Sequence, residues 1–469
     1  MNILYIGAGF VGTCSAAVSA DSGHGALVYD INKERIRKLS SGKRDVIESC
    51  LFEDGLAELL IRCKKNITFT NSAPEMKKFI DRVDAIFMCL PTPEKAGEEG
   101  QSNLSYYEAA CETLAKMLSK RQGGKQSSYV VIINKSTLPI SMIDRTKEIL
   151  EAHKVKNFGI VSNPEFLVEG KAVYDSIHPD RVVIGAENEK DFKIMRALYQ
   201  RFYTSSSVKY IEVNPHEAEA GKLLANFMLF SRLALCFDVI GRTCESFPRI
   251  SFERVRDILK IDPRIAPWGL YDSLYAGGSC FIKDAASLAY QLESAGGNAE
   301  LVRGVLGANN YQLDHFLSRI HAEAHAIIKG VRIALFGAAF KQHTNDVRNS
   351  GAIRATEFFL QEGAQEIKVY DPAATDEFKR VFNPKKDAQY KKITYTKSED
   401  ACLKSTSMAF IATDWPQFQS LAEIIQKTVK APYLIMDGRR MLCNSYNNLQ
   451  SAGFSIIAVG SQFMKGKKV

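Results

Sequence analysis

The run Gly7-Ala8-Gly9-Phe10-Val11-Gly12 constrains the fold of this 469-residue chain more than any other feature. Its glycines have the spacing G-x-G-x-x-G, between an apolar run at 2–6 and small residues typical of a helix at 13–20. In that setting the first glycine makes a tight turn, the second admits a pyrophosphate, and the third lets strand and helix pack closely. The sequence therefore predicts a strand, a loop and a helix that together bind a dinucleotide.

An acidic residue follows the second predicted strand, where such units bind ribose. This strand, 26–29, ends at Asp30, which stands 18 residues after Gly12. A carboxylate at this place accepts hydrogen bonds from the ribose hydroxyls and repels a 2′-phosphate, which favours NAD over NADP. Arg35 lies five residues further on and would soften that preference.

Strand-like runs alternate with helical stretches through the first 205 residues. Further predicted strands cover 85–90, 129–134 and 158–161. Such alternation predicts a parallel, doubly wound sheet whose ligands bind at the carboxyl ends of the strands. The residues at those ends suit a binding site, although Pro, Ser and Asn are also common in ordinary turns. They are Pro91-Thr92-Pro93, Lys135-Ser136-Thr137 and Ser162-Asn163-Pro164-Glu165.

From about His216 the apolar residues recur with a period of 3.6, which predicts a long helix. Lys222 and Asn226 are four residues apart and share one face, with Glu219 one turn earlier. That face is either part of a site or the solvated side of a connecting helix. The apolar stripe comprises Ala220, Leu223, Leu224, Phe227, Phe230 and Ala234.

Cys280 follows a Gly277-Gly278-Ser279 turn and precedes Lys283 by three residues and Asp284 by four. A helix that begins near Cys280 would place the sulfur at its positive end, which favours the thiolate. A thiolate beside a carboxylate suits covalent chemistry on a carbonyl, with the carboxylate moving protons. A buried structural cysteine is the alternative.

The opening pattern returns in the last third of the chain. A predicted strand at 331–336 leads into Gly337-Ala338-Ala339-Phe340-Lys341, and another at 366–370 ends at Asp371. The second and third glycines are missing, so this second Rossmann-type half is expected to hold a nucleotide other than a dinucleotide. Strands at 408–413 and 433–436 lead into Asp414-Trp415 and Asp437-Gly438-Arg439-Arg440. Arginines at strand ends suit a diphosphate.

Composition and cysteine spacing narrow the class of protein. The net charge of +8 is spread along the chain without a basic block interleaved with aromatics, which makes nucleic-acid binding a weak hypothesis. An anionic small substrate explains the excess as well. The ten cysteines contain no CxxC pair, which predicts reduced thiols, a cytoplasmic location and no metal site. Arg232 and Asp238 interrupt the apolar run 227–241, which argues against a membrane span.

Taken in order, these motifs resemble those of the UDP-glucose 6-dehydrogenase family, within the wider UDP-glucose/GDP-mannose dehydrogenases, and the resemblance runs nearly end to end. It implies two Rossmann-like domains, 1–205 for NAD and 326–469 for a nucleotide sugar. A central helical domain, 206–325, would join them, carry the cysteine loop and form a homodimer or larger assembly. The implied reaction is a four-electron, NAD-dependent oxidation of the C6 hydroxyl of UDP-glucose. GDP-mannose is the first alternative substrate and a UDP-N-acetylamino sugar the second; a non-catalytic binding protein and a two-electron alcohol dehydrogenase are further alternatives.

The resemblance also implies roles for particular residues. Asp284, Thr137 and a water would handle the proton of the C6 hydroxyl, and Cys280 would form a thiohemiacetal and then a thioester. Glu165 would be the base for hydrolysis, Lys222 would stabilise the oxyanion, and Asn226 would orient the sugar. Cofactor contacts are expected from Gly7, Gly9, Phe10, Val11, Gly12, Asp30, Arg35, Pro91, Thr92, Thr137, Glu169, Lys283 and Arg348. Substrate contacts are expected from Phe166, Leu167, Glu169, Lys222, Asn226, Arg264 (toward the neighbouring subunit), Tyr271, Tyr275, Gly277, Phe340, Lys341 and Arg439 or Arg440.

Six residues depart from the family pattern. Ile282 stands where proline is usual, Phe237 where asparagine is usual, and His343 where aspartate is common. Asn134 replaces a common glutamate before Lys-Ser-Thr, and Tyr275-Ala276 replaces a Gly-aromatic pair. In the family that last loop wraps the substrate, so Tyr275 is expected to reshape the pocket.

Overall fold

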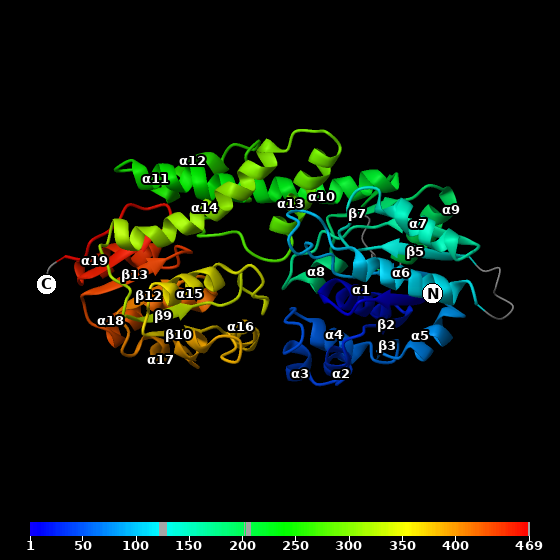
Figure 1. The fold of residues 1–469 in the computed structure, drawn as a ribbon, viewed down its shortest axis with the longest axis horizontal. Helices are drawn as coiled ribbons and strands as arrows, with labels where there is room; N and C mark the ends of the chain where they lie inside the picture. The colour runs from blue at the N-terminus through cyan, green and yellow to red at the C-terminus, as the bar shows by residue number, and fades with distance from the viewer. Residues whose placement is uncertain (122–128, 201, 203–207, 468–469) are drawn as a thin grey trace. The chain divides into compact units, whose positions relative to one another are not determined.

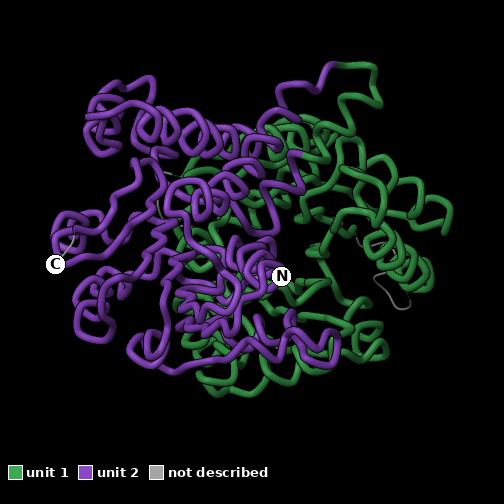
Figure 2. Tube along the Cα trace, turned by 60° about the vertical axis from the view of Figure 1, so that its left-hand side comes forward, with its two compact units in different colours: residues 1–225, 286–297 green, residues 226–285, 298–469 purple. Residues whose placement is uncertain are grey.

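The computed structural model describes residues 1–121, 129–200, 202 and 208–467, and the chain divides into two compact units. Unit 1 comprises residues 1–225 and 286–297, and unit 2 comprises 226–285 and 298–469 (Figure 2). The division passes through two helices, α10 (Pro215–Ala234) and α13 (Phe281–Ser294). The three domains expected from the sequence, with boundaries at 205/206 and 325/326, remain a prediction.

Strand β1 (Asn2–Ile6) shows why unit 1 is a layered α/β structure. Ile3 and Tyr5 pack into one hydrophobic cluster, and Leu4 and Ile6 pack into another. Successive side chains of a strand point to opposite faces of the sheet, so both faces of β1 are covered. Residues of α1, α2, α4, α8 and α9 contribute to the first cluster, and residues of α5, α6 and α7 to the second.

The described residues of unit 1 form an eight-stranded sheet in the order β3-β2-β1-β4-β5-β6-β7-β8. Strands β2, β3, β5 and β7 of this sheet are labelled in Figure 1. The order reverses between β1 and β4, which is where doubly wound sheets bind ligands. All described pairings are parallel except β6 with β7, which is antiparallel at Ser162 and Gly185. The strands are β1, β2 (Gly25–Tyr29), β3 (Ile67–Thr70), β4 (Ala85–Met88), β5 (Val130–Asn134), β6 (Phe158–Ser162), β7 (Arg181–Gly185) and β8 (Lys209–Val213). The helices are α1 (Phe10–Asp21), α2 (Lys33–Leu39), α3 (Arg44–Glu48), α4 (Leu56–Arg62), α5 (Ala73–Ile80), α6 (Ser105–Leu118), α7 (Met142–Ala152), α8 (Ala172–Ile177) and α9 (Glu189–Tyr199).

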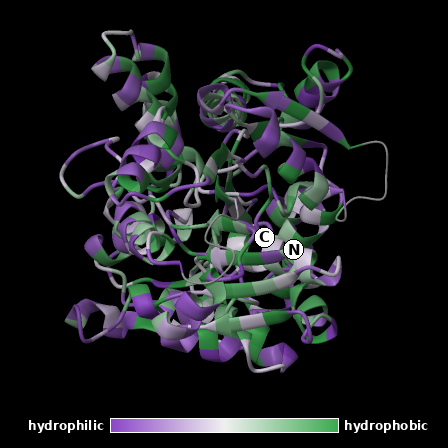
Figure 3. Cartoon of the chain, turned by 90° about the vertical axis from the view of Figure 1, so that its right-hand side faces the viewer, coloured by the Kyte–Doolittle hydropathy of each residue, from purple (hydrophilic) through white to green (hydrophobic). Residues whose placement is uncertain are grey.

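Unit 2 contains a six-stranded parallel sheet in the order β11-β10-β9-β12-β13-β14. Hydrophilic and hydrophobic segments alternate along the helices of the chain (Figure 3), as expected for helices with one face on a sheet and the other in solvent. The strands are β9 (Arg332–Phe336), β10 (Glu366–Tyr370), β11 (Ile393–Tyr395), β12 (Met408–Ile411), β13 (Tyr433–Asp437) and β14 (Phe454–Ala458). The α-helices are α11 (Arg242–Ser246), α12 (Phe252–Lys260), α14 (Glu300–Ala322), α15 (Gly351–Gln361), α16 (Thr375–Val381), α17 (Glu399–Leu403), α18 (Leu421–Thr428) and α19 (Tyr446–Ser451), with short turns η2 (Ala388–Lys392), η3 (Pro416–Ser420) and η4 (Cys443–Ser445). The predicted fold class, two Rossmann-like sheets joined by a helical region, is confirmed.

The long predicted helix continues beyond α10 through a π-helical turn, η1 (Leu235–Gly241), into α11. Leu223, Phe230 and Ala234 are buried as the stripe predicts, but Leu224 is 48% exposed. The helical stretch Pro215–Ser246 is long and apolar enough to cross a membrane, and 33% of its most apolar window is buried. Length and composition alone do not distinguish such a span from a core helix.

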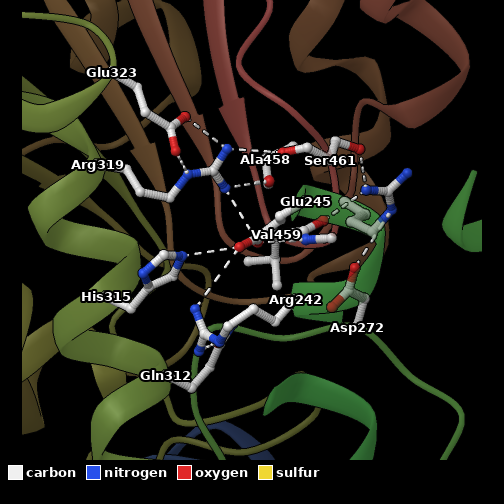
Figure 4. Close-up of polar contacts among 12 residues, drawn as sticks. Arg242, Glu245, Asp272, Gln312, His315, Arg319, Glu323, Ala458, Val459 and Ser461 are labelled. Atoms are coloured by element: carbon white, nitrogen blue, oxygen red, sulfur yellow. Dashed lines mark hydrogen bonds and ion pairs between the residues drawn. The ribbon is translucent and has the colours of Figure 1, made fainter. Parts of the chain in front are cut away.

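Arg319 of α14 is the largest side chain fully buried in unit 2, and a charge network holds it in place. Its guanidinium donates to Glu245, Glu323 and the carbonyl of Ala458, and His315 pairs with Glu245 at 2.9 Å (Figure 4). Because a buried charge is costly unless it is paired and hydrogen-bonded, each nitrogen needs these partners. The network thereby fixes α11 and α14 to the end of β14.

Candidate active site

The glycine-rich loop has the geometry that a bound dinucleotide requires. Gly7 has φ +106°, and a Cβ there would lie 2.2 Å from the Cys89 carbonyl oxygen. A Cβ on Gly12 would lie 2.1 Å from the Gly7 oxygen, so both positions demand glycine for packing. A Cβ on Gly9 would meet nothing within 4 Å, directly before α1 begins at Phe10. The loop thus leaves open space at a helix N-terminus, where backbone N–H groups bind phosphate, and its residues fit NAD.

Asp30 lies at the end of β2, as the ribose hypothesis expects. Its Oδ2 accepts a hydrogen bond from the Ala8 N–H at 2.8 Å, and its side chain is 10% exposed. Arg35 Nη1 lies 3.4 Å from the same oxygen. The carboxylate is therefore held toward the glycine loop while Arg35 offsets part of its charge.

The different packing of Gly9 and Gly12 gives a matched pair of substitutions. Gly9→Ala is expected to raise the Kd for NAD about tenfold, roughly 1.4 kcal/mol, because the new methyl occupies space that the cofactor needs. Its melting temperature is expected to stay near that of the wild type, since the methyl meets no protein atom. Gly12→Ala is expected to lower the melting temperature, because its Cβ would overlap the Gly7 oxygen. Calorimetric titration with NAD and thermal melts check both; unchanged NAD affinity in Gly9→Ala would contradict the assignment.

The loops after β4 and β5 are tied to each other. Thr92 Oγ1 donates to the Thr137 carbonyl at 2.8 Å, and Ser136 Oγ accepts from the Leu90 N–H at 2.8 Å. Pro91 lies in the first of these loops, and Glu169 is a half-buried residue of the segment after β6. All of these predicted cofactor contacts belong to unit 1, whereas Lys283 and Arg348 belong to unit 2. There, Lys283 pairs with Asp284 at 2.5 Å and Arg348 with Asp346 at 2.6 Å.

Lys222 and Glu165 form a buried ion pair in unit 1. Lys222 Nζ lies 3.1 Å from Glu165 Oε1, with side-chain exposures of 6% and 8%. The second carboxylate oxygen accepts from the Leu167 N–H at 2.5 Å, and the ammonium also lies 5.3 Å from the centre of the Phe166 ring. A cation and a carboxylate, both shielded from water, can stabilise an oxyanion and move a proton.

Two further charged residues of unit 1 lie near this pair, and sequence reasoning gave them no role. Lys135 donates to Asn163 Oδ1 at 3.2 Å and Tyr199 Oη at 3.3 Å, and burial lowers its pKa to about 8. Burial raises the pKa of Glu219 to about 7. The sequence contains features that could have identified both residues. Lys135 is the first residue of the Lys-Ser-Thr motif, and Glu219 stands three residues before Lys222.

Asn226, Cys280 and Asp284 meet at the start of α13 in unit 2. Cys280 directly precedes the helix, and its carbonyl accepts from the Asp284 N–H at 2.8 Å. Asn226 Nδ2 donates to Asp284 Oδ2 at 2.6 Å, and Ser279 Oγ lies 3.7 Å from the Cys280 sulfur. The expected helix start is thus present directly after Cys280. The fixed carboxylate of Asp284, 1% exposed, can exchange protons one turn away.

The turn before Cys280 packs closely on the loop after β9. A Cβ on Gly277 would lie 2.3 Å from the Asn349 oxygen, and one on Gly278 would lie 2.9 Å from the Phe340 ring. Gly278 has φ +90°, its N–H donates to the Arg348 carbonyl at 3.1 Å, and Lys341 Nζ lies 5.8 Å from the centre of the Phe340 ring. The two predicted substrate segments of unit 2 therefore form one surface.

Tyr275 is 7% exposed and belongs to the hydrophobic core of unit 2. The Arg354 guanidinium lies 5.3 Å from the centre of its ring. On the opposite side of the loop, Ala276 exchanges two hydrogen bonds with the side chain of Asn309. The Tyr275 side chain, which stands where the family has glycine, thus lies in the core of unit 2. Tyr271 and Arg264, by contrast, are exposed, at 48% for Tyr271 and 87% for the Arg264 side chain.

Arg439 and Arg440 have different surroundings. Arg440 donates to Glu253 and Ser461 and to the Val459 carbonyl, which engages its guanidinium within the protein. Arg439 donates to Ser273 at 2.9 Å and pairs with Asp414 at 2.8 Å, with a side chain that is 15% exposed. Of the two, Arg439 has the environment that leaves a hydrogen-bonding edge for an anion.

Asp371 shows why the second sheet does not repeat the first site. It stands after β10 as Asp30 stands after β2, but its carboxylate accepts from the indole of Trp415 and from four backbone N–H groups. Those four belong to Ala338, Ala339, Ala373 and Ala374. A carboxylate with five protein donors has no lone pair left for ribose hydroxyls. Among the described residues, no group of three or more His, Cys, Asp or Glu could hold a metal ion.

Three domain models of one family together match most of the chain. Residues 1–203 match the NAD binding domain of the UDP-glucose/GDP-mannose dehydrogenase family, 216–311 its central domain and 334–444 its UDP binding domain. UDP-glucose 6-dehydrogenase TuaD of Bacillus subtilis (strain 168) is 31% identical over 468 residues, covering 99% of this chain and 94% of that protein. UDP-glucose 6-dehydrogenase of Bos taurus is 30% identical over 480 residues, covering 98% and 93%.

Solved structures have a similar fold. A UDP-glucose dehydrogenase from the hyperthermophilic archaeon Pyrobaculum islandicum aligns with a TM-score of 0.82 at 26% identity, covering 94% of each chain. A UDP-D-ManNAc dehydrogenase from Pyrococcus horikoshii aligns with a TM-score of 0.80 at 22% identity, covering 98% of this chain and 99% of that one. Because its sequence identity is only 22%, the similarity to the Pyrococcus horikoshii structure supports the fold and not the substrate.

Proposed function

We propose that this chain, which belongs to the UDP-glucose/GDP-mannose dehydrogenase family of NAD-dependent oxidoreductases, oxidises the C6 hydroxyl of UDP-glucose to the carboxylate of UDP-glucuronate. The observation that carries the proposal is the cluster at the start of α13. There a cysteine at a helix N-terminus stands one turn before a buried carboxylate that Asn226 holds in place. A nucleophile and a proton carrier in this arrangement suit covalent oxidation of an aldehyde.

The reaction divides into steps that this chain's residues can perform. The glycine loop and Asp30 would hold NAD, which would supply the hydride acceptor, with one NAD consumed in each of the two oxidations. Asp284, with Thr137 and a water, takes the proton of the C6 hydroxyl as it becomes an aldehyde. The Cys280 thiolate then adds to the aldehyde carbon, and Lys222 stabilises the oxygen anion of the thiohemiacetal.

The second half of the reaction converts the thiohemiacetal to the acid. Loss of its C6 hydrogen as hydride leaves a thioester on Cys280. Glu165 takes a proton from water, which adds to the thioester carbonyl, and Cys280 leaves as thiolate. The Lys222 ammonium lies 3.1 Å from this carboxylate. The tethered aldehyde is not released, because it stays covalently bound until it is an acid.

For the nucleotide-sugar end we assign Lys341 and Arg439 to the diphosphate. Arg439 keeps a partly exposed guanidinium beside Ser273, while Arg440 is engaged by Glu253, Val459 and Ser461. Planar guanidinium groups bind diphosphate oxygens in a bidentate way. Ser279 before Cys280 favours glucose over an N-acetylamino sugar, because the branch of the family that acts on N-acetylamino sugars usually has histidine at that position.

We further propose that a second copy of the chain covers the exposed apolar residues of the long helix. Leu224, Met228, Leu235 and Val239 are 48%, 66%, 55% and 53% exposed, at helical spacings of 4, 7 and 4 residues. The exposed Arg264 would reach the substrate of that neighbour. All ten cysteines are free, which supports a reducing, cytoplasmic location. Sedimentation equilibrium is expected to give twice 52.2 kDa or a higher multiple; a single-chain mass at every concentration would refute the assembly.

The experiment that tests the function is the yield of NADH per sugar consumed, measured in parallel on UDP-glucose, GDP-mannose and a UDP-N-acetylamino sugar. Two NADH per UDP-glucose is the expected result. Two NADH on another sugar alone would keep the chemistry and change the substrate. One NADH would indicate a two-electron alcohol dehydrogenase. Calorimetric binding of NAD and UDP-glucose with no NADH formed would indicate a non-catalytic homologue.

A further inference from the structure

Glu219 is a buried charged residue that the proposed mechanism does not use. It lies on α10 one turn before Lys222 and is 6% exposed. Its Oε2 accepts from the Ser141 N–H at 2.8 Å, and its Oε1 accepts from the Ile143 N–H at 3.1 Å and from Ser162 Oγ at 3.2 Å. The carboxylate therefore holds three donors from two elements other than its own.

Those donors stand next to residues assigned to catalysis. Ser141 and Ile143 begin α7, four and six residues after Thr137, and Ser162 ends β6, three residues before Glu165. A cavity of about 10 Å³ is lined by Thr137, Lys222 and Glu219, together with Asn134, Ser136, Leu138, Ser162 and Pro164. Glu219 and the catalytic residues Thr137 and Lys222 thus face one small space.

Asn134 brings a second observation to the same cavity. It is 2% exposed, its Oδ1 accepts from the hydroxyl of Tyr107, and its Nδ2 has no hydrogen-bond partner within the described residues. A buried N–H group without a partner is costly, and a cavity of this size is about the smallest that holds one water. Asn134 also stands where the family usually has a glutamate.

We propose that Glu219 is a positioning residue whose ionised carboxylate fixes the Thr137 loop and the end of β6 against the helix that carries Lys222. The kinetic test of this inference rests on the proposed function, because it measures the oxidation of UDP-glucose. A neutral side chain accepts fewer hydrogen bonds from N–H groups than a carboxylate does. Loss of the charge therefore loosens the start of α7 and the geometry of Thr137, while substrate binding elsewhere is spared.

The groups that face Glu219 decide how its ionisation depends on pH. His216 lies on the same helix and pairs with Asp144 of α7, whose hydrogen bond raises the pKa of the imidazole. Lys222 lines the cavity, and Tyr107 of α6 stays neutral because burial holds its pKa well above the ordinary value. Burial raises the pKa of Glu219 to about 7 despite its three donors. The carboxylate is thus mainly ionised above pH 7 and protonated below it.

Activity and stability then have opposite pH trends. For a carboxyl whose folded-state pKa is raised, the folded protein binds the proton more tightly than the unfolded chain, so its contribution to stability falls as pH rises from about 4.5 to 7. The ionised form that positions Thr137 is therefore the less stable one. If Glu219 served only in packing, activity and stability would not change in opposite directions with pH.

The test compares the wild type with Glu219→Gln at pH 6 and pH 8. At pH 8 the variant is expected to have a kcat about 30-fold lower with KM for UDP-glucose changed less than about threefold. At pH 6 the difference is expected to shrink to about threefold or less, because the wild-type carboxyl is then protonated too. The melting temperature of Glu219→Gln relative to wild type is expected to rise with pH. Asn134→Asp, which adds a carboxylate to the cavity, is expected to move the acid limb of the wild-type profile to higher pH.

Two matched variants separate positioning from general damage. Asp191→Asn removes another buried carboxylate of unit 1, on α9, with a pKa also raised by burial; it is expected to lower stability with a pH-independent effect on kcat. His216→Gln removes a nearby cation that lowers the pKa of Glu219, so it is expected to move the acid limb slightly to higher pH without abolishing it. A kcat ratio between wild type and Glu219→Gln that does not change with pH would overturn the proposal.

Amide hydrogen exchange gives a readout that does not depend on turnover. The amides of Ser141 and Ile143 are expected to exchange at least about tenfold faster in Glu219→Gln and to be unchanged in Asp191→Asn. Unchanged exchange in both variants would overturn the positioning role whether or not the protein is active. If the two variants show this exchange pattern but the wild-type protein oxidises no nucleotide sugar, the positioning role stands and the proposed function is refuted.

Discussion

Cys280→Ala is expected to abolish formation of the sugar carboxylate, with a fall of about 10³-fold or more in the rate of acid production. Without the sulfur, the aldehyde has no covalent attachment and cannot pass through a thioester. The remaining residues, including Asp284 and Asn226 at the start of α13, can still remove the first proton. The measurement is NADH and UDP-glucuronate formed per UDP-glucose consumed, followed by chromatography of the sugar products.

A second cysteine serves as the control for this substitution. Cys443 is also partly buried, with a pKa raised by burial, but it lies in η4 after β13. Cys443→Ala is expected to keep two NADH per sugar. Cys280→Ser keeps the size of the side chain but not its nucleophilicity, so it is expected to behave like the alanine variant. One NADH per sugar in the wild type, unaffected by Cys280→Ala, would show that the cysteine has no part in the reaction.

The strands and loops of the first sheet could be predicted because their signals are local. The glycine spacing of the first loop and the apolar runs before Asp30 and Asn134 each identify a strand and its carboxyl end, as the structure confirms for β1, β2 and β5. The long helix was predicted from its period, yet Leu224 lies exposed, since periodicity shows that a face is apolar and not what covers it. The sequence did not predict strand β8 or the antiparallel step between β6 and β7, because the direction of a strand is set by its pairing and not by local residue types.

The polar environment of the site could not be predicted, because it is set by tertiary contacts. Arg439 and Arg440 are neighbours in sequence, but only Arg440 meets Glu253 and the end of β14. Asp371 has the same sequence context as Asp30, but the indole of Trp415 and four backbone N–H groups take up its oxygens. Glu219 was noted only for its helical spacing. Its partners Ser141 and Ser162 lie 78 and 57 residues away along the chain.

Lys222→Met is expected to lower kcat by about 10²–10³-fold and to destabilise the fold by about 3–5 kcal/mol. Both effects follow from the buried pair at 3.1 Å, with exposures of 6% and 8%. The ammonium is the proposed partner of the developing oxyanion, and its removal leaves the Glu165 carboxylate buried without its cation. Urea unfolding and steady-state kinetics measure the two losses separately.

The double variant Lys222→Met/Glu165→Gln separates structure from chemistry. Removing both charges leaves neither ion unpaired, so stability is expected to return to within about 1–2 kcal/mol of the wild type. Activity is expected to remain as low as in either single variant or lower, because neither the oxyanion partner nor the base for hydrolysis is restored. We therefore expect the free energy of unfolding to recover in the double variant while kcat stays low. That result would assign the ion pair to catalysis. If kcat recovers together with stability, Lys222 and Glu165 serve only to hold the loop after β6 against α10, and the base and the oxyanion partner must be other residues.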